Sequence, residues 1–146
     1  MLRLALRTAS LGALVLATPA CDSGLETADG LLLVSVVPQF GVVPGPQLVL
    51  ESKPVVGCVP ALSVDVESSA GRLDVTVRGV SSGDAGFCPD GQENPAYAFV
   101  LLPESMGDVA IQIRHDGSLD RYRYACAEAD CQLLAVQTST TRLATP

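Results

Sequence analysis

The chain has no tryptophan, a single histidine and few aromatic residues, which make up 4% of its 146 residues. Cations are also scarce, because 9 lysines and arginines stand against 16 acidic residues and give a formal net charge of −7. A surface of that sign repels phosphate backbones, so nucleic acid is a poor partner. No segment has the 3.6-residue periodicity of a long helix, and no internal repeat is present.

The apolar run near the N-terminus, Leu11–Ala17, is too short to span a bilayer as a stable helix. It follows a short basic head formed by Arg3 and Arg7 and precedes the small residues Thr18–Cys21. This is the layout of a cleaved secretory signal peptide at residues 1–20. Its removal leaves 126 residues, enough for one domain with a single core, and lowers the formal net charge to −9 because both arginines leave with it.

The end of this signal, Ala20 followed by Cys21, resembles that of bacterial lipoproteins. In that family the cysteine after the cut is acylated and becomes the first residue, which implies a lipid on Cys21 and a place on a membrane of the bacterial cell envelope. The cysteine count agrees with acylation of Cys21. The chain has 5 cysteines, so acylation leaves four, an even number, and an exported domain normally pairs its thiols. The alternative is an ordinary signal cut near Ala20, which leaves Cys21 as a free thiol.

Val, Thr, Ser, Gly and Pro are abundant after the signal, which is typical of an all-β domain with many turns. We expect a polar tether over residues 21–30, an antiparallel β-sandwich of about seven to eight strands over residues 31–138, and a flexible C-terminal tail over residues 139–146. Strands outside the two hairpins described below are expected at Leu31–Val37, Leu48–Glu51, Val55–Val59, Tyr97–Leu102 and Leu133–Gln137.

Leu62–Val77 alternates apolar and polar residues on both sides of the turn sequence Ser68–Gly71. If those four residues form the loop, Glu67 faces Arg72 and every leucine and valine lies on one face. A one-residue slip would destroy that face, so the alternation predicts a hairpin.

A second hairpin is predicted around Asp116-Gly117, a strong two-residue turn signal. Its register pairs Val109 with Tyr124, Ile111 with Tyr122 and Ile113 with Asp120, and places both tyrosines toward the core. Arg114, Arg121 and Arg123 share the other face. They are a candidate binding surface for an anionic sugar or an acidic partner segment, although cations on exposed strands also serve simply to prevent edge-to-edge aggregation.

The spacing of Asp120, Tyr124 and Cys126 resembles that of immunoglobulin-type domains, in which this pattern ends a core strand. The resemblance covers about fifteen residues and favours a sandwich over a barrel. It implies nothing about function, because that fold hosts many roles.

The four remaining cysteines allow three disulfide pairings. Loop entropy favours local closure, which joins Cys126 to Cys131 and leaves Cys58 with Cys88. The immunoglobulin resemblance implies instead that Cys58 joins Cys126 and Cys88 joins Cys131. A metal site is not predicted from these cysteines, because their spacing is loose and the compartment oxidises thiols.

Three further features could carry chemistry. Gly79–Gly83 matches the G-x-S-x-G pattern of a hydrolase nucleophile at Ser81, but a loop follows it and no helix, so we expect a chance match. The one histidine, His115, is expected to be a solvated turn residue.

The long loop Ser81–Pro95 offers oxygen ligands for Ca²⁺, namely Asp84, Asp90, Gln92, Glu93 and Asn94. The alternative is a solvated loop that is held only by a disulfide at Cys88.

The sequence therefore predicts a lipid-anchored, disulfide-stapled protein of the cell envelope that is not an enzyme and needs no cofactor or metal. Its expected role is that of a binding or structural accessory module that docks on another envelope protein. The alternative is a module that binds an extracellular glycan or another small ligand, in one version with Ca²⁺, through the loop at residues 81–95.

Overall fold

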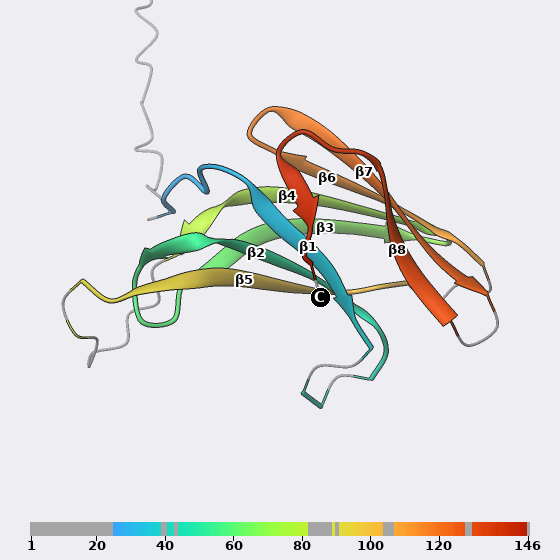
Figure 1. Cartoon of the computed structure of the whole chain (residues 1–146), viewed down its shortest axis with the longest axis horizontal. Helices are drawn as coiled ribbons and strands as arrows, with labels where there is room; N and C mark the ends of the chain where they lie inside the picture. Colours follow the sequence, from blue (N-terminus) through green and yellow to red (C-terminus); the bar gives the residue numbers. More distant parts are fainter. Residues whose placement is uncertain are drawn as a thin grey trace, which may run out of the picture.

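The computed structural model describes residues 25–38, 41–42, 44–81, 89, 91–103, 107–127 and 130–145. These residues form nine strands and no α-helix, which confirms the predicted all-β class (Figure 1). Within these ranges there is no helix long and apolar enough to cross a membrane. The strands are β1 (Leu32–Val37), β2 (Gln47–Val56), β3 (Ala61–Ser69), β4 (Arg72–Ser81), β5 (Glu93–Leu101), β6 (Val109–His115), β7 (Ser118–Ala127), β8 (Asp130–Gln137) and β9 (Thr141–Leu143).

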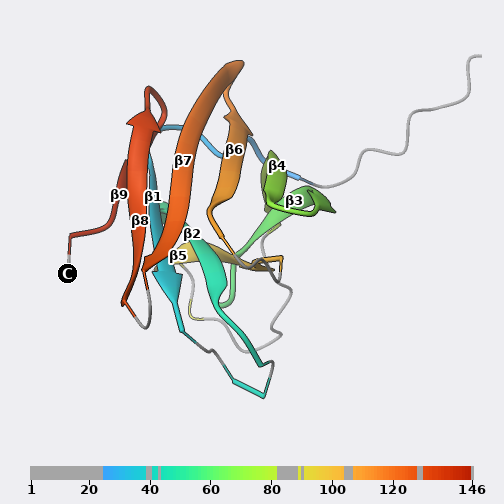
Figure 2. The ribbon, with the colours of Figure 1, turned by 90° about the vertical axis from the view of Figure 1, so that its right-hand side faces the viewer.

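All nine strands belong to one sheet, in the order β8-β7-β6-β4-β3-β5-β2-β1-β9. The sheet curves so strongly that its two edge strands, β8 and β9, come to lie on the same side of the molecule (Figure 2). The predicted antiparallel, immunoglobulin-like sandwich of seven to eight strands is therefore wrong, and the sheet is mixed, nearly closed and barrel-like. The physical reason is parallel pairing between strands that are distant in sequence, namely β1 with β9, β3 with β5 and β4 with β6, which hairpin patterns do not reveal.

The two predicted hairpins both form. In β6–β7 the register is the expected one, with Ile111 opposite Tyr122. In β3–β4 it differs by two residues, because the turn contains only Ala70 and Gly71, and Gly71 has a φ of +72° that suits a tight turn. A shift of two preserves the side of the sheet on which each residue lies, so the predicted apolar face survives.

The core fills the inside of the curved sheet. Its largest buried side chains come from strands on both halves of the sheet, including Leu50 of β2, Leu73 of β4 and Ile111 of β6. Each such side chain contributes about 1.5–3 kcal/mol when it is fully buried. Because both halves face the same core, this burial holds the curvature in place.

Both ends of the described chain join the sheet. In the expected tether, the backbone of Glu26 exchanges two hydrogen bonds with Val80, at 2.9 Å and 2.8 Å. A Cβ on Gly79 would lie 2.3 Å from the Glu26 carbonyl oxygen, so only glycine permits this contact. In the expected flexible tail, Thr141–Leu143 forms β9 and pairs with β1. The segment is ordered because the buried Thr141 donates to Asp120 of β7, a partner that its own polar sequence does not reveal.

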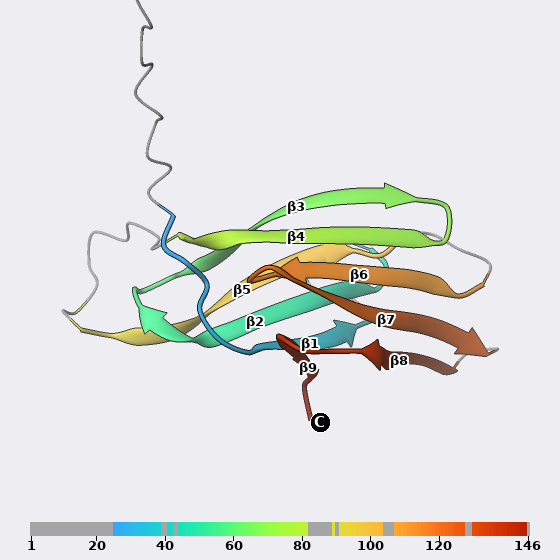
Figure 3. The same ribbon diagram turned by 90° about the horizontal axis from the view of Figure 1, so that it is seen from above.

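The first described residues and the C-terminal end of β7 lie at opposite ends of the long axis (Figures 1 and 3). β1 begins just after Gly30 and runs away from it, whereas β6 ends at His115, whose ring contacts Gly30. We call the end near Gly30 and His115 the chain-entry end. The opposite end, where β1 and β7 finish and β2 and β6 begin, is the far end.

Candidate functional site

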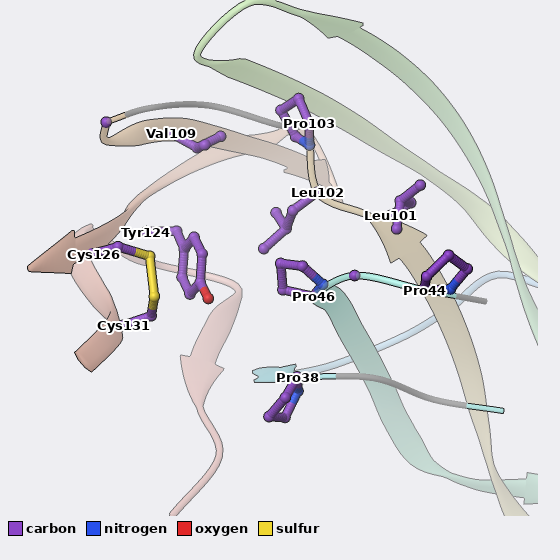
Figure 4. A pocket seen from close by; sticks show the side chains of 12 residues that line it. Pro38, Pro44, Pro46, Leu101, Leu102, Pro103, Val109, Tyr124, Cys126 and Cys131 are labelled. Atoms are coloured by element: carbon purple, nitrogen blue, oxygen red, sulfur yellow. A yellow bond between two sulfur atoms is a disulfide. The ribbon is translucent and has the colours of Figure 1, made fainter. Parts of the chain in front are cut away.

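An apolar pocket of about 420 Å³ opens at the far end of the sheet. Figure 4 shows the Tyr124 ring and the Cys126–Cys131 disulfide on one side of it, with proline rings on the other. Its lining consists of Pro38, Pro44, Gly45, Pro46, Leu101, Leu102, Pro103, Gly107, Val109, Tyr124, Cys126 and Cys131.

Prolines form the mouth of this pocket because they stand where strands begin and end. Pro38 directly follows β1, Pro46 directly precedes β2, and Pro103 lies two residues after β5. Proline has no backbone N–H and cannot continue a ladder, so the chain leaves the sheet at these positions and their rings remain exposed to the pocket. The amide of Leu102 donates to the carbonyl oxygen of Pro46 at 3.0 Å, and this bond joins two of the segments that border the pocket.

The disulfide in the pocket wall decides between the two predicted pairings. Cys126 of β7 and Cys131 of β8 are directly opposite one another and are joined, so local closure is confirmed for this pair. The Cys58–Cys126 pairing implied by the immunoglobulin resemblance is wrong. Cys58 is also disulfide-bonded, but Cys88 lies outside the described residues, so the predicted Cys58–Cys88 bond is not placed.

A second hollow of about 350 Å³ adjoins the pocket and shares Pro38, Tyr124 and Cys131 with it. Its other lining residues are Val36 of β1 together with Asp130 and Leu133 of β8. These two strands are not paired with each other. We call this hollow the β1–β8 seam.

The described lining of the pocket is mostly apolar. Among its described residues, the phenol of Tyr124 is the one titratable group, and they include no carboxylate, imidazole or amine. These residues offer apolar contact area and one hydroxyl, a combination that suits an apolar ligand group. They do not include the acid–base pair that most hydrolytic chemistry uses. This pocket was not predicted because six separate stretches of the chain build it, although the prolines at predicted strand ends were a usable signal.

A different cluster lies at the chain-entry end, where the carboxylate of Asp120 is fully buried, with 0% exposure. It accepts hydrogen bonds from the backbone amides and hydroxyls of Ser139, Thr140 and Thr141, at distances between 2.6 Å and 3.3 Å. The hydroxyls of Tyr122 and Thr141 are 2.5 Å apart. Since Thr141 donates to Asp120, Tyr122 is the donor in that pair.

Two effects act on the pKa of Asp120. Burial raises it, but the hydrogen bonds from Thr141 and Ser139 and from the neighbouring backbone amides favour the charged form and outweigh burial. The net pKa is lowered from its usual value of 3.8. Asp120 is therefore an ionised structural clasp that holds the β8–β9 connection against β7.

His115 was expected to be a solvated turn residue, and that expectation is wrong. It is 4% exposed, and its Nε2 lies 2.9 Å from the carbonyl oxygen of Gly30. A nitrogen that contacts a carbonyl oxygen must carry the proton, so this nitrogen is a donor and is not available as a base. The structure buries His115 because the N-terminal segment crosses the β6–β7 turn there, and a hairpin sequence alone does not show that.

The G-x-S-x-G match places Ser81 at the end of a strand. Gly79, Val80 and Ser81 are the last residues of β4, and the Ser81 hydroxyl donates to the carbonyl oxygen of Ala61 at 3.3 Å. Ser82 and Gly83 lie outside the described residues.

The structure brings the three predicted arginines together on the outer face of β6 and β7. Arg114 and Arg123 are more than half exposed and lie 4.0 Å from Asp74 and 3.5 Å from Asp108. Arg121 donates to the side chain of Gln137 at 2.5 Å. We call Arg114, Arg121, Arg123 and Arg72 the arginine face.

Arg72 was missed by the sequence analysis because it lies on the other hairpin. The parallel pairing of β4 with β6 brings it beside Gln112, whose side chain it contacts at 3.2 Å. Arg72 also binds Asp74 at 2.6 Å, and this hydrogen bond lowers the pKa of Asp74 despite partial burial. Four cations and two acids thus share a face of a chain whose net charge is strongly negative.

The loop predicted to offer Ca²⁺ ligands is described only in part. Asp84 and Asp90 lie outside the described residues. The Asn94 amide nitrogen donates to the carbonyl oxygens of Gly57 at 2.8 Å and Cys58 at 3.3 Å, so this side chain braces the backbone. In the described part of the chain, no three His, Cys, Asp or Glu side chains cluster as a metal site would require.

The chain matches no protein-family model, no curated protein and no solved structure. What the pocket and the arginine face can bind therefore follows from their own chemistry: apolar groups at the far end, and carboxylates or other anions on the outer face of β6 and β7.

Proposed function

We propose that the protein is a lipid-anchored component of the bacterial cell envelope that acts as a non-catalytic binding or structural accessory module. The observation that carries this proposal is the position of the first described segment of the chain, which lies at the end of the fold opposite the C-terminal end of β7 (Figures 1 and 3). Tyr124 and Cys126, near that end of β7, line the apolar pocket. An acylated Cys21 just upstream then holds the fold by its chain-entry end. The pocket points away from the membrane, toward whatever the module binds.

The arginine face supports a protein partner with an acidic segment. The mature chain carries a formal net charge of −9, so a cationic face is a local exception that a negatively charged partner can recognise. Guanidinium groups bind carboxylates in a forked geometry, and those of Arg114 and Arg123 are exposed enough to do so. A second envelope protein that offers Asp or Glu is the partner we propose.

The non-catalytic part of the proposal is supported by the use already made of the candidate catalytic groups. His115 and Ser81 both donate to backbone carbonyl oxygens, and the described residues of the pocket lining include no general base.

The anchor is tested by the intact mass of the protein from detergent-extracted envelopes, before and after reduction with alkylation. We expect a chain that begins at Cys21 and carries acyl mass, with four further thiols that react only after reduction. A chain without acyl mass, with Cys21 free or joined to another molecule, contradicts the anchor and indicates a secreted protein.

The partner surface is tested by the double variant Arg121→Glu with Arg123→Glu. We expect a partner that co-purifies with the wild-type protein in detergent to be lost. The matched control is Arg78→Glu with Arg142→Glu, which makes the same charge change at two exposed arginines outside the arginine face. Retention of the partner by the first variant, or equal loss with both, contradicts a specific role for this face.

A further inference from the structure

The sheet is not closed along the whole length of β1. On one side β1 pairs with β2 from Leu33 to Val37. On the other side β9 pairs only with Leu32, Leu33 and Val34. In the described part of the chain no strand continues this second ladder past Val34, and the β1–β8 seam occupies the remaining length.

The backbone of Val36 faces this seam. The amide of Leu32 donates to Thr140 and the carbonyl oxygen of Val34 accepts from Ala144, so the peptide groups of these residues point toward β9. Peptide groups along a strand point alternately to either side, and those of Val36 therefore point the same way, into the seam.

The edge of β8 presents the same kind of backbone from the opposite side. The Cα atoms of Cys126 and Cys131 are only 4.0 Å apart, which is the spacing of a non-hydrogen-bonded antiparallel pair. In such a pair the peptide groups point away from the partner strand, so those of Cys131 point out of the sheet. Leu133, two residues further along, does the same.

We propose that the β1–β8 seam binds an extended peptide strand of a partner protein and that the Pro-lined pocket takes one of its apolar side chains. The strand runs parallel to β1 and antiparallel to β8, so it completes the closure of the sheet. The peptide has apolar side chains at alternate positions, because every second one points inward toward Tyr124. This inference deepens the proposed function and rests on its binding role.

The chain itself shows what fits there. β9 already occupies the first part of the same gap as an extended segment parallel to β1. It leaves the ladder after the bond from Ala144 to Val34, one step before Val36. A partner strand placed beyond the end of β9 continues along β1 in the same direction. It pairs with the open edges of β1 and β8, which would otherwise favour unspecific aggregation.

The test is selection of a displayed library of random nine-residue peptides on the purified full-length mature protein, followed by titration of the selected peptides. We expect alternating apolar sequences whose affinity falls about fivefold to tenfold for Val36→Pro, since proline removes one N–H donor to the peptide and spares the bonds to β2. Val136→Ser is the control, because Val136 is 66% exposed on β8 and lines neither hollow, and its affinity should not change.

Hydrogen exchange in the wild-type protein keeps the test independent of the folding of Val36→Pro. Bound peptide should slow exchange at the amides of Val36 and Leu133 and leave that of Ser35 unchanged. No selected alternating sequence, or peptides that bind without protecting these amides, overturns the seam as a strand acceptor. If the acylated protein still holds its envelope partner through the arginine face, the proposed function survives that result.

Discussion

Asp120 is a buried carboxylate whose negative charge is balanced by hydrogen-bond donors and by no cation in its contacts. Its partners come from three consecutive residues, Ser139 to Thr141, that connect the last two strands. Without it the buried amide of Thr141 and the half-buried amides of Ser139 and Thr140 would lose their acceptor, and a buried amide without a partner costs about 1–3 kcal/mol. One side chain thus determines whether the C-terminal strand is docked.

Replacement of Asp120 by alanine should lower the free energy of unfolding by about 3 kcal/mol or more, because the two buried donors of Thr141 and the half-buried donors of Ser139 and Thr140 lose their acceptor together. Urea denaturation followed by circular dichroism measures this. Asp65→Ala serves as the control, since Asp65 is exposed and its pair with Arg78 should contribute less than about 1 kcal/mol. Equal losses in both variants would contradict the clasp.

The stability of the protein should fall in acid, and Asp120 should account for much of that fall. Its pKa is lower in the folded chain than the usual 3.8, so the unfolded chain binds the proton more readily. The stabilisation is therefore fully present above about pH 5 and is lost as the pH falls through 3.8 toward the folded pKa. Urea midpoints between pH 2.5 and 7 should show this slope, and Asp120→Asn should flatten it; an unchanged slope argues against this assignment.

At the scale of elements, local signals predicted local structure. The Asp116-Gly117 turn has φ values of +48° and +70°, which a two-residue hairpin turn requires, and the predicted register of β6–β7 is confirmed. The Ser68–Gly71 sequence was compatible with a loop of four or of two residues. Alternation alone cannot separate registers that differ by two, so β3–β4 was misplaced by that amount.

Features that combine distant segments could not be predicted in this way. The parallel pairs β1–β9 and β4–β6 leave no periodic trace in sequence, and the predicted sandwich failed because of them. The pocket was missed for the same reason. The arginines were placed correctly on one face because a single hairpin carries all three, whereas Arg72 needed the β4–β6 pairing to join them.

The N-terminal segment depends on one glycine of β4. In Gly79→Ala, the added Cβ would meet the Glu26 carbonyl oxygen at 2.3 Å, so the bridge between Glu26 and Val80 should break. We expect faster hydrogen exchange at these two amides and a loss of about 1–3 kcal/mol of stability. Gly107→Ala is the control, because nothing lies within 4 Å of its added Cβ. Unchanged exchange at Glu26 in Gly79→Ala would refute this prediction.

At the scale of the whole molecule, the sheet consists of two runs of strands joined at a narrow point. In the described part of the chain, β8-β7-β6-β4-β3 and β5-β2-β1-β9 meet through one ladder pair, Ala61–Tyr97. So few ladder contacts would not hold two independent sheets together. The shared core, and the clasp at Asp120 that fixes β9, must therefore supply most of the coupling between them.

Because of that shared core, we expect one cooperative unfolding transition. Tyrosine fluorescence and far-ultraviolet circular dichroism should give coincident urea curves, since Tyr122 and Tyr124 lie in one run and Tyr97 in the other. Two separated transitions would mean that the runs unfold independently. Calorimetric and van't Hoff enthalpies that agree provide a second check.

The position of β1 between β2 and β9 has a mechanical consequence. A pull on the N-terminal end along β1 loads both of its ladders in shear, after the two bonds between Glu26 and Val80 have opened. Bonds loaded in shear must break together, so resistance to such a force is set by the unfolding barrier and not by the strength of one bond. A protein tethered at this end would thus keep its far end intact under drag that strips away weaker contacts.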